Sequence, residues 1–470
     1  MIRPNYLPRL YQQRILRIAT LLLTLSSPGW ILLLFYTPDF PLGAGMVLLP
    51  AFAILTAITV SQLSKGDAFE RRVLLVGLVF KLCAAGMYNA MVFFVYNGNV
   101  DSLTYYRTGS DWAANFSMLG TDAILHPYWG VPFITMLAGA MIYFVPSYAA
   151  VAGIFALVSY WGQYFLYRAF TIALPEGDAD EIALLVFLLP SLSFWSAAVG
   201  KEAVTLFGIG LCVYGYARAS ARANPAGYLI AGVGVAVAGL VRPHIAAMLS
   251  LALASAISLS STKRGIIGML NKFIGIPLII VGTIYIVRQA QITVGAGDFS
   301  SGVASVERIS HTSGGGGSSF SGSLTSRILY APFLLFRPFP WEITSAVAAL
   351  ACLEGLALAV LFWRRRRNLW YAVKNWRNPF ILFAFAFSLQ FVVVFSAAIS
   401  NFGILIRERV MLLPMAVMFL CLPRTRRKMV SAGAGGWRSR FGGRAGFPKV
   451  PVLSPSSSDV VGPRVPVSRV

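Results

Sequence analysis

Acidic residues are scarce in this sequence. Only 17 of its 470 residues are Asp or Glu, against 39 Lys or Arg, so the formal net charge is +22. Charged residues of both signs make up 12% of the chain, whereas apolar residues make up 57%. One water-soluble core of this length cannot bury so much apolar surface. The composition therefore excludes an ordinary soluble globular protein and predicts a chain that faces lipid.

Cysteine and histidine are also rare, with four and three copies. All four cysteines fall inside apolar runs, which indicates packing residues rather than disulfides or a zinc site. With only three histidines, the sequence does not favour a histidine-rich metal site. The chain also lacks a Walker-type Gly-Lys-Ser/Thr, a placed dinucleotide fingerprint and a His-Glu-x-x-His motif. The signatures of common soluble enzymes are thus missing.

Long apolar runs recur along the chain. A helix needs about 20 residues to cross about 30 Å of hydrocarbon. Val73–Val95 and Phe380–Ala398 are apolar on every face, whereas the strands of a membrane barrel would alternate. We therefore predict an all-α, polytopic transmembrane helical bundle with about 11–14 membrane segments. The expected segments are 15–36, 44–63, 73–97, 131–146, 149–169, 182–198, 203–217, 226–241, 245–260, 273–288, 328–336 (short), 343–362, 379–399 and 409–422.

Basic residues cluster at the ends of these runs. This distribution sets membrane orientation and argues against nucleic acid as a partner. Ten basic residues and one acid, Asp459, lie beyond Pro423 in a stretch rich in Gly, Pro and Ser. Such a stretch cannot form a core. We predict a transmembrane domain over 1–422 and a disordered, basic cytoplasmic tail over 423–470 that contacts membrane lipid.

The same rule orients the loops. With the tail inside, Arg364–Arg367 is cytoplasmic and the loops 98–130 and 289–341 lie outside. The first loop could fold into short interfacial helices. Three apparent segments lie between it and the outer turn at Lys201, where an even number is required. We therefore expect the stretch from Val131 to about Pro146 to be re-entrant or merged with a neighbour.

Asp101 opens the first outer loop, and Asp111 and Asp122 follow it. A carboxylate there could accept a proton from an acceptor hydroxyl, or hold a divalent cation such as Mg²⁺ or Mn²⁺. The alternative is a solvated aspartate or a helix cap. We select Asp101 as the candidate catalytic residue and Tyr105 and Arg107 as candidate substrate contacts.

Further charged side chains occur at the same predicted face. A proline-broken run ends in Lys201 and Glu202, and broken helices at membrane depth often line cavities. Several arginines around one cavity would suit a diphosphate, because forked guanidinium donors match phosphate oxygens. Alternatively, each cation reaches out to lipid headgroups or forms an ion pair. The candidate substrate-binding residues at this face are Lys201, Glu202, Arg242, His244, Arg337, Arg407 and Arg409.

In their order along the chain, these motifs resemble those of bacterial GT-C-type polytopic glycosyltransferases and related polysaccharide polymerase-like membrane proteins. The resemblance covers about 98–414 and rests on Asp101-x-x-x-Tyr105 with Gly109, PSLSFWSAAVGKE, LVRPH, FRPFPWE and NFGILIRERVMLLP. It implies transfer of a sugar from a polyprenyl-phosphate carrier to a glycan or lipid acceptor, on the outer face of the bacterial inner membrane. It also implies that Asp101 is the acidic residue of the outer loop that is catalytic or binds a metal in this family. Ser102 stands where the family often has a second acid, so metal dependence stays open.

Other functions compete with this reading. One is a polymerase of O-antigen or exopolysaccharide, which would recognise two lipid-linked oligosaccharides. Another is a transporter or flippase of lipid-linked glycans, which would predict internal repeats and charges within the spans. Lys81 is the main charge inside a run, and no half-to-half repeat is apparent. A purely structural subunit would instead leave the outer charges paired with one another.

Overall fold

The structure is a computed structural model that divides into two units, Met1–Thr425 and Arg426–Val470. Every helix named below belongs to the first unit. The basic tail 423–470, the segment 273–288 and the loop 289–327 fall almost wholly outside the described residues. Apart from a few isolated positions, the described residues are 9–37, 45–64, 66–119, 130–175, 177–222, 226–259, 329–399 and 401–422.

Within these ranges the chain forms sixteen α-helices and no β-strand, which confirms the predicted all-α class. The helices are α1 (Arg9–Leu34), α2 (Gly45–Leu63), α3 (Ala68–Ala90), α4 (Asp101–Leu119), α6 (Val131–Phe144), α7 (Tyr148–Ala173), α8 (Ala179–Leu188), α9 (Pro190–Phe194), α10 (Lys201–Arg222), α11 (Ala226–Val241), α12 (Pro243–Leu259), α16 (Ala346–Arg364), α17 (Arg366–Lys374), α18 (Pro379–Ala398), α19 (Phe402–Glu408) and α20 (Leu413–Leu420). Short π or 3₁₀ turns are η1 (Met91–Val95), η2 (Ala331–Phe333), η3 (Pro340–Glu342) and η4 (Arg409–Met411).

Six of the described helices are long and apolar enough to cross a membrane. They comprise α1, α2, α3 continued by η1, α7, α16 and α18, and α6, α11 and α12 are shorter apolar helices. These helices differ in how much of their apolar stretch is buried, which is 78% for α7 and only 6% for α1. An apolar helix with so little protein around it requires lipid. α7 is thus a central helix, and α1 lies at the lipid-facing periphery.

Two predicted segments are less regular than expected. The stretch 328–336 contains the 3₁₀ turn η2 rather than a span, and 409–422 begins with the turn η4 before α20. Pro332 lies inside η2 and Pro414 at the start of α20, where each ring removes a backbone donor. In the predicted outer loop 98–130, the described residues 98–119 contain one 19-residue helix, α4, which is longer than the short interfacial helices expected there.

Small residues let the central helices approach closely. A Cβ added at Gly210 of α10 would lie 2.2 Å from the carbonyl oxygen of Gly162 on α7. One added at Gly234 of α11 would lie 2.3 Å from the backbone nitrogen of Cys212 on α10. No side chain fits at such distances, so these backbones pack as small-residue helix pairs do in membranes.

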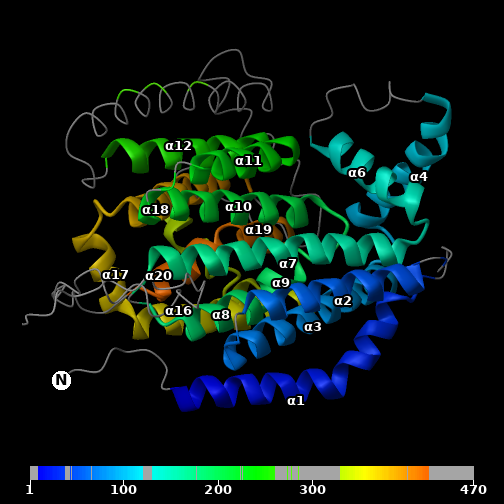
Figure 1. The fold of residues 1–470 in the computed structure, drawn as a ribbon, viewed down its shortest axis with the longest axis horizontal. Helices are drawn as coiled ribbons and strands as arrows, with labels where there is room; N and C mark the ends of the chain where they lie inside the picture. Colours follow the sequence, from blue (N-terminus) through cyan, green and yellow to red (C-terminus); the bar gives the residue numbers. More distant parts are fainter. Residues whose placement is uncertain are drawn as a thin grey trace, which may run out of the picture. The chain divides into compact units, whose positions relative to one another are not determined.

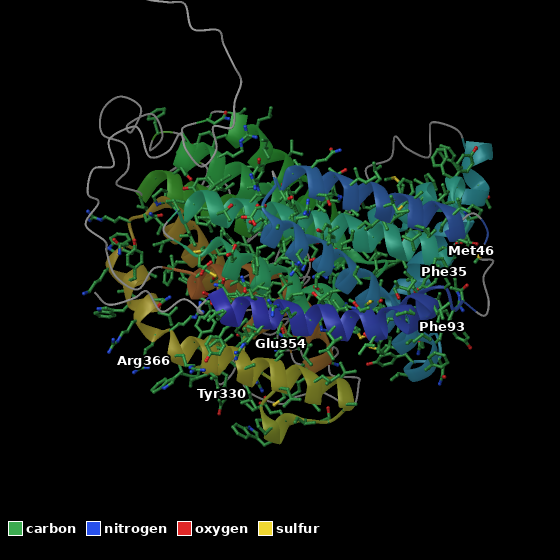
Figure 2. The ribbon with its side chains drawn as sticks, turned by 60° about the horizontal axis from the view of Figure 1, so that its bottom comes forward. Phe35, Met46, Phe93, Tyr330, Glu354 and Arg366 are labelled. Carbon is green, nitrogen blue, oxygen red and sulfur yellow. The ribbon has the colours of Figure 1, made fainter. Side chains whose placement is uncertain are left out.

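The helices α7 and α10 connect two ends of the unit. The α7 end at Tyr148 packs its ring against Tyr106 of α4, with the centroids 5.1 Å apart, and α10 begins there at Lys201. The opposite ends of both helices meet the start of α18. Figure 1 shows α4 and α6 at one end and α17 at the other. Figure 2 likewise separates Phe93 from Arg366. We call these the Asp101 end and the Lys374 end.

The helix α6 begins and ends at the Asp101 end. Gly130, just before it, donates to the carbonyl of Leu240 at 2.8 Å, next to Arg242. Ser147, just after it, precedes the α7 residue that packs on α4. Gly109 and Gly139 bring α4 and α6 together along their length. α6 therefore does not cross between the ends, and only α7 and the α8–α9 segment connect them between 131 and 200.

The α8–α9 segment is broken where Leu189 precedes Pro190. Leu189 is extended, as residues before proline tend to be. Lys81 of α3 is completely buried and donates to the Ser193 carbonyl at 3.0 Å and to Ser196 Oγ at 2.6 Å. Gln163 of α7 donates to the Val186 carbonyl at 3.0 Å. These side chains satisfy backbone groups freed by the break and fix the chain that leads to Lys201.

Candidate functional site

Asp101 lies in the first turn of α4, where the helix dipole favours a carboxylate. Its side chain is 56% exposed, and its Oδ2 accepts a hydrogen bond of 2.9 Å from Arg407 Nη1. The described residues donate no hydrogen bond to its other oxygen, Oδ1. Asp101 is therefore a carboxylate held on one side and open on the other.

The short helix α19 brings Arg407 to this carboxylate. Asn401 caps α19, accepting a hydrogen bond from the Gly403 backbone N–H at 2.7 Å. The Arg407 Nε lies 3.1 Å from Glu202 Oε1. The Glu202 carboxylate raises the pKa of Arg407, an effect that burial opposes. The guanidinium thus stays charged between two carboxylates that belong to α4 and α10.

Arg242, in the turn between α11 and α12, continues this arrangement inward. Its Nη2 donates to Glu202 Oε1 at 2.7 Å, and its Nη1 donates to Glu408 Oε2. All three of these residues are buried, with Arg242 only 6% exposed. We call Asp101, Arg407, Glu202, Arg242 and Glu408, in that order, the charged chain. It joins segments far apart in sequence and is exposed only at its Asp101 terminus.

The charged chain is nearly balanced. Its three carboxylates face two guanidinium groups, and the partly exposed Lys201 interacts electrostatically with Glu202, Arg242 and Arg407. With Lys201 included, three charges of each sign lie together. The sequence analysis foresaw converging cations, whereas the structure also brings their carboxylate partners. Arg242 is enclosed between its partners, so only Arg407 and Lys201 remain accessible to an anion.

The remaining candidates near Asp101 have different surroundings. Tyr105 is buried one turn along α4, where burial and the Asp101 charge raise the pKa of the phenol to about 12. It is therefore a neutral hydrogen-bond donor at neutral pH. His244 is partly buried, with its ring centroid 5.8 Å from that of Phe395. Arg107 is exposed on α4 and takes no part in the charged chain.

Arg409 and Arg337 form a separate cluster beside the charged chain. Arg409 is fully buried, and its Nη2 donates to Ser191 Oγ at 3.2 Å and lies 3.5 Å from Glu354 Oε2. Its Nη1 donates to the Arg337 carbonyl at 2.9 Å. Arg337 pairs with Glu342, its Nε 3.1 Å from Oε1, and stacks over Phe402. Figure 2 shows Glu354 on α16. Both arginines hold protein segments together, and Arg409 has no exposed surface for a phosphate.

A metal site is not evident in the part of the chain that the structure describes, where no three His, Cys, Asp or Glu side chains lie close enough to hold an ion. Arg407 separates Asp101 from Glu202. A divalent cation at Asp101 would therefore compete with the Arg407 ion pair and take its other ligands from water or substrate. Asp122, the last of the loop aspartates, lies outside the described residues.

The sequence analysis did not select three acidic residues of these clusters, Glu342, Glu354 and Glu408. Glu408 lies between the selected Arg407 and Arg409, and Glu354 lies within the apolar run that became α16. A signal was present, because an ionisable residue within so apolar a chain needs a buried partner. Which cation each carboxylate meets depends on contacts 166 positions apart for Arg242–Glu408, and spacing does not show them.

The fold and this site define a membrane protein built as a polytopic helical bundle, with a charged chain at one end. No protein-family model, curated protein or solved structure matches it. The charged chain and its exposed carboxylate are therefore the features from which a function follows.

Proposed function

We propose that this protein is a membrane glycosyltransferase that takes a sugar from a polyprenyl-phosphate carrier and transfers it to a glycan or lipid acceptor. The Asp101 end faces outward from a bacterial inner membrane, and the basic Lys374 end faces the cytoplasm, in keeping with the positive-inside rule. The protein would then serve polysaccharide assembly for the cell envelope.

The observation that carries the proposal is the state of Asp101. Arg407 is held by the buried Glu202, which Arg242 links to Glu408. Arg407 in turn fixes one oxygen of Asp101, while the Asp101 side chain stays 56% exposed. A general base needs this combination of fixed orientation and access. The acceptor hydroxyl gives its proton to Asp101 as its oxygen bonds to the anomeric carbon. The sugar–phosphate bond breaks, and polyprenyl phosphate departs with the bonding electrons.

The departing phosphate needs positive charge nearby. Arg407 and Lys201 are the two cations of the site with exposed surface, and both lie at the Asp101 terminus of the charged chain. A guanidinium that is already oriented stabilises developing phosphate charge without reorganising. The neighbouring Tyr105 and Tyr106 are buried, so they support α4 beside Asp101 rather than present an open aromatic face to the substrate.

The main alternative is a purely structural role for the charged chain, because ion pairs also hold α4, α10 and α19 together. The two readings differ in the effect of Asp101→Asn, which preserves size and removes charge. A transferase loses roughly 10²–10⁴-fold in turnover, the usual contribution of a general base, with protein abundance unchanged. If the ion pair is purely structural, Asp101→Asn instead lowers the abundance of the protein.

The test measures labelled sugar transferred from a panel of polyprenyl-phosphate monosaccharides in membranes that contain equal amounts of each variant. Asp111→Asn is the matched control, since Asp111 is an exposed aspartate on the same helix and should retain near-normal turnover. Full activity in Asp101→Asn would reject the proposed base. Abundance that falls in parallel with activity would support the structural role.

A further inference from the structure

A second polar site lies at the Lys374 end, remote from the charged chain. A pocket of about 600 Å³ opens between the ends of α7 and α10 and the turn that joins α17 to α18. Its polar lining includes Ser220, Lys374, Asn375, Arg377 and Asn378. This volume lies in the range of small-molecule sites.

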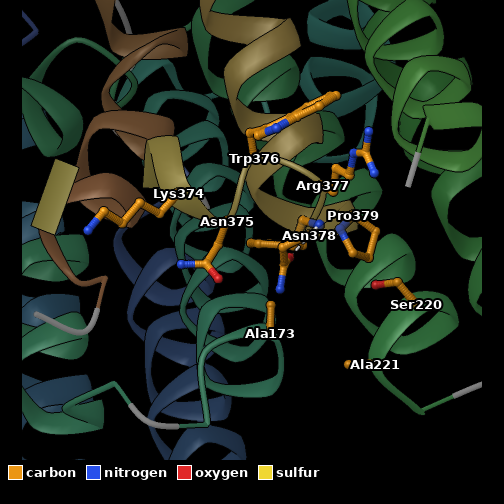
Figure 3. A pocket seen from close by; sticks show the side chains of 10 residues that line it. Ala173, Ser220, Ala221, Lys374, Asn375, Trp376, Arg377, Asn378 and Pro379 are labelled. Atoms are coloured by element: carbon orange, nitrogen blue, oxygen red, sulfur yellow. Dashed lines mark hydrogen bonds between the residues drawn. The ribbon is translucent and has the colours of Figure 1, made fainter. Parts of the chain in front are cut away.

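The described residues that line this pocket carry charge of one sign. They include Lys374 and Arg377 and no acid. Figure 3 shows these two cations on opposite sides, with the amide groups of Asn375 and Asn378 between them. Lys374 Nζ lies 5.8 Å from the ring centroid of Trp370, and the Arg377 guanidinium lies 5.1 Å from that of Trp376. The stacked rings hold both cations without neutralising them.

Helix dipoles modify this charge but do not reverse it. The ends of α7 and α10 that border the pocket are C-termini, each equivalent to about half a negative charge. The start of α18 at Pro379 contributes about half a positive charge to the same space. Lys374 and Arg377 add two full positive charges, so the pocket remains cationic. It therefore favours an anion.

The surroundings of the pocket are those of a membrane interface. Trp363, Trp370 and Trp376 are all at least half exposed, and tryptophan gathers at headgroup level. α17 is short and amphipathic, with Asn368 and Ala372 turned inward and basic residues outward. The long helix α7 ends at this level and the long helix α18 begins there. The apolar floor of Ala173, Pro379 and Phe380 then suits the glycerol end of a lipid.

We propose that this pocket binds the headgroup of an anionic phospholipid. The amides of Asn375 and Asn378 hydrogen-bond to the phosphate oxygens, and Lys374 and Arg377, on either side of them, attract the anion through their charge. The site needs neither Asp101 nor a sugar substrate, so it stands or falls separately from the proposed transferase activity.

The experiment uses the full-length protein in nanodiscs of phosphatidylcholine that contain graded fractions of phosphatidylglycerol. Native mass spectrometry then counts the phosphatidylglycerol molecules that stay bound after release from the disc. The double variant Lys374→Gln/Arg377→Gln should weaken retention roughly 10- to 30-fold, given the usual worth of two basic residues against anionic lipid. Ser220→Phe, which fills the pocket without changing charge, should weaken retention as well.

The matched control is Arg366→Gln/Arg367→Gln, which removes the same charge from exposed positions on α17 outside the pocket. It should change retention less than threefold. Equal losses in both double variants, or full retention in Ser220→Phe, would show a diffuse basic surface and overturn the pocket. Displacement of phosphatidylglycerol by millimolar inorganic phosphate would likewise overturn it, in favour of a soluble anion. Variants are compared only as monodisperse protein, and Ser220→Phe preserves a test should the double variant misfold.

Discussion

The two ends of this molecule handle charge in opposite ways. At the Asp101 end, three carboxylates interleave with two arginines, and the inner members are almost completely buried. At the Lys374 end, Lys374, Arg377 and Arg366 are exposed and lie over tryptophan rings. A buried charge must have a counter-charge because desolvation is expensive, whereas water and lipid headgroups satisfy an exposed cation.

Arg365 shows that burial, rather than the end of the molecule, decides which rule applies. It lies at the Lys374 end among exposed arginines, yet it is only 6% exposed. It pairs with the buried Glu181 of α8, and its Nη1 donates to the Leu420 carbonyl at 2.8 Å. Of the four consecutive arginines Arg364–Arg367, the buried one, Arg365, is the one that pairs with a carboxylate. The contrast between the ends is therefore a contrast between burial and exposure, which substitutions can test.

The largest effect is expected from Arg242→Ala. Removing Arg242 leaves Glu202 and Glu408 buried and without their shared cation. Breaking a buried pair in this way usually costs about 3–5 kcal/mol of folding free energy. We expect a large fall in abundance and in the thermal unfolding temperature of the detergent-solubilised protein.

Arg218→Ala is the control for Arg242→Ala. Arg218 is a partly buried arginine of α10 that lies over the Tyr214 ring, and that contact is worth about 0.5–1 kcal/mol. Adding Glu202→Gln and Glu408→Gln to Arg242→Ala should recover part of the lost stability by removing the unpaired charges. Similar unfolding temperatures for Arg242→Ala and Arg218→Ala would contradict the claim that burial makes pairing necessary.

Helix packing between the two ends provides the next largest effect. A Cβ at Gly234 would meet the backbone of α10, whereas one at Gly232, two positions earlier on α11, meets no atom within 4 Å. Gly234→Ala should therefore destabilise the protein by about 1–3 kcal/mol through overpacking. Gly232→Ala should be neutral or slightly stabilising, because alanine favours helix. Thermal unfolding of the two variants checks this difference, and equal unfolding temperatures would mean that α10 and α11 are not in close contact.

The sequence was informative where composition decides the outcome. Runs such as Phe380–Ala398 predict helices because hydrocarbon admits few other structures, and α18 covers almost the same residues. Pro190 likewise predicts the break between α8 and α9. The glycines of α10 and α11 carried the packing signal, but they were not recognised, because an apolar run does not show which face meets a neighbour.

The site was less accessible to sequence analysis for the same reason. Charged motifs pointed to Asp101, Glu202, Arg242 and Arg407, and the structure joins these four in one chain. The pairing itself depends on the route of the backbone, which places α19 beside α4 although about 300 residues separate them. Arg409 illustrates the limit, since its position in the sequence resembles that of Arg407 but its side chain turns into the protein.

The smallest effect on stability is expected at the exposed terminus of the charged chain, in the Asp101–Arg407 pair. A double-mutant cycle of Asp101→Asn and Arg407→Gln isolates this pair from the contact that Arg407 also makes with Glu202. The two side chains are 56% and 27% exposed, so water and salt screen the attraction and the coupling should be about 0.2–1 kcal/mol. Molar salt should reduce it further, because the Debye length falls to about 3 Å. Unfolding temperatures of the four proteins at low and high salt measure both quantities. A coupling of several kcal/mol that resists salt would mean that Asp101 is held as a structural ion, like Glu408. A small, screened coupling combined with a large loss of turnover in Asp101→Asn would mean that this carboxylate contributes to transfer and little to the stability of the fold.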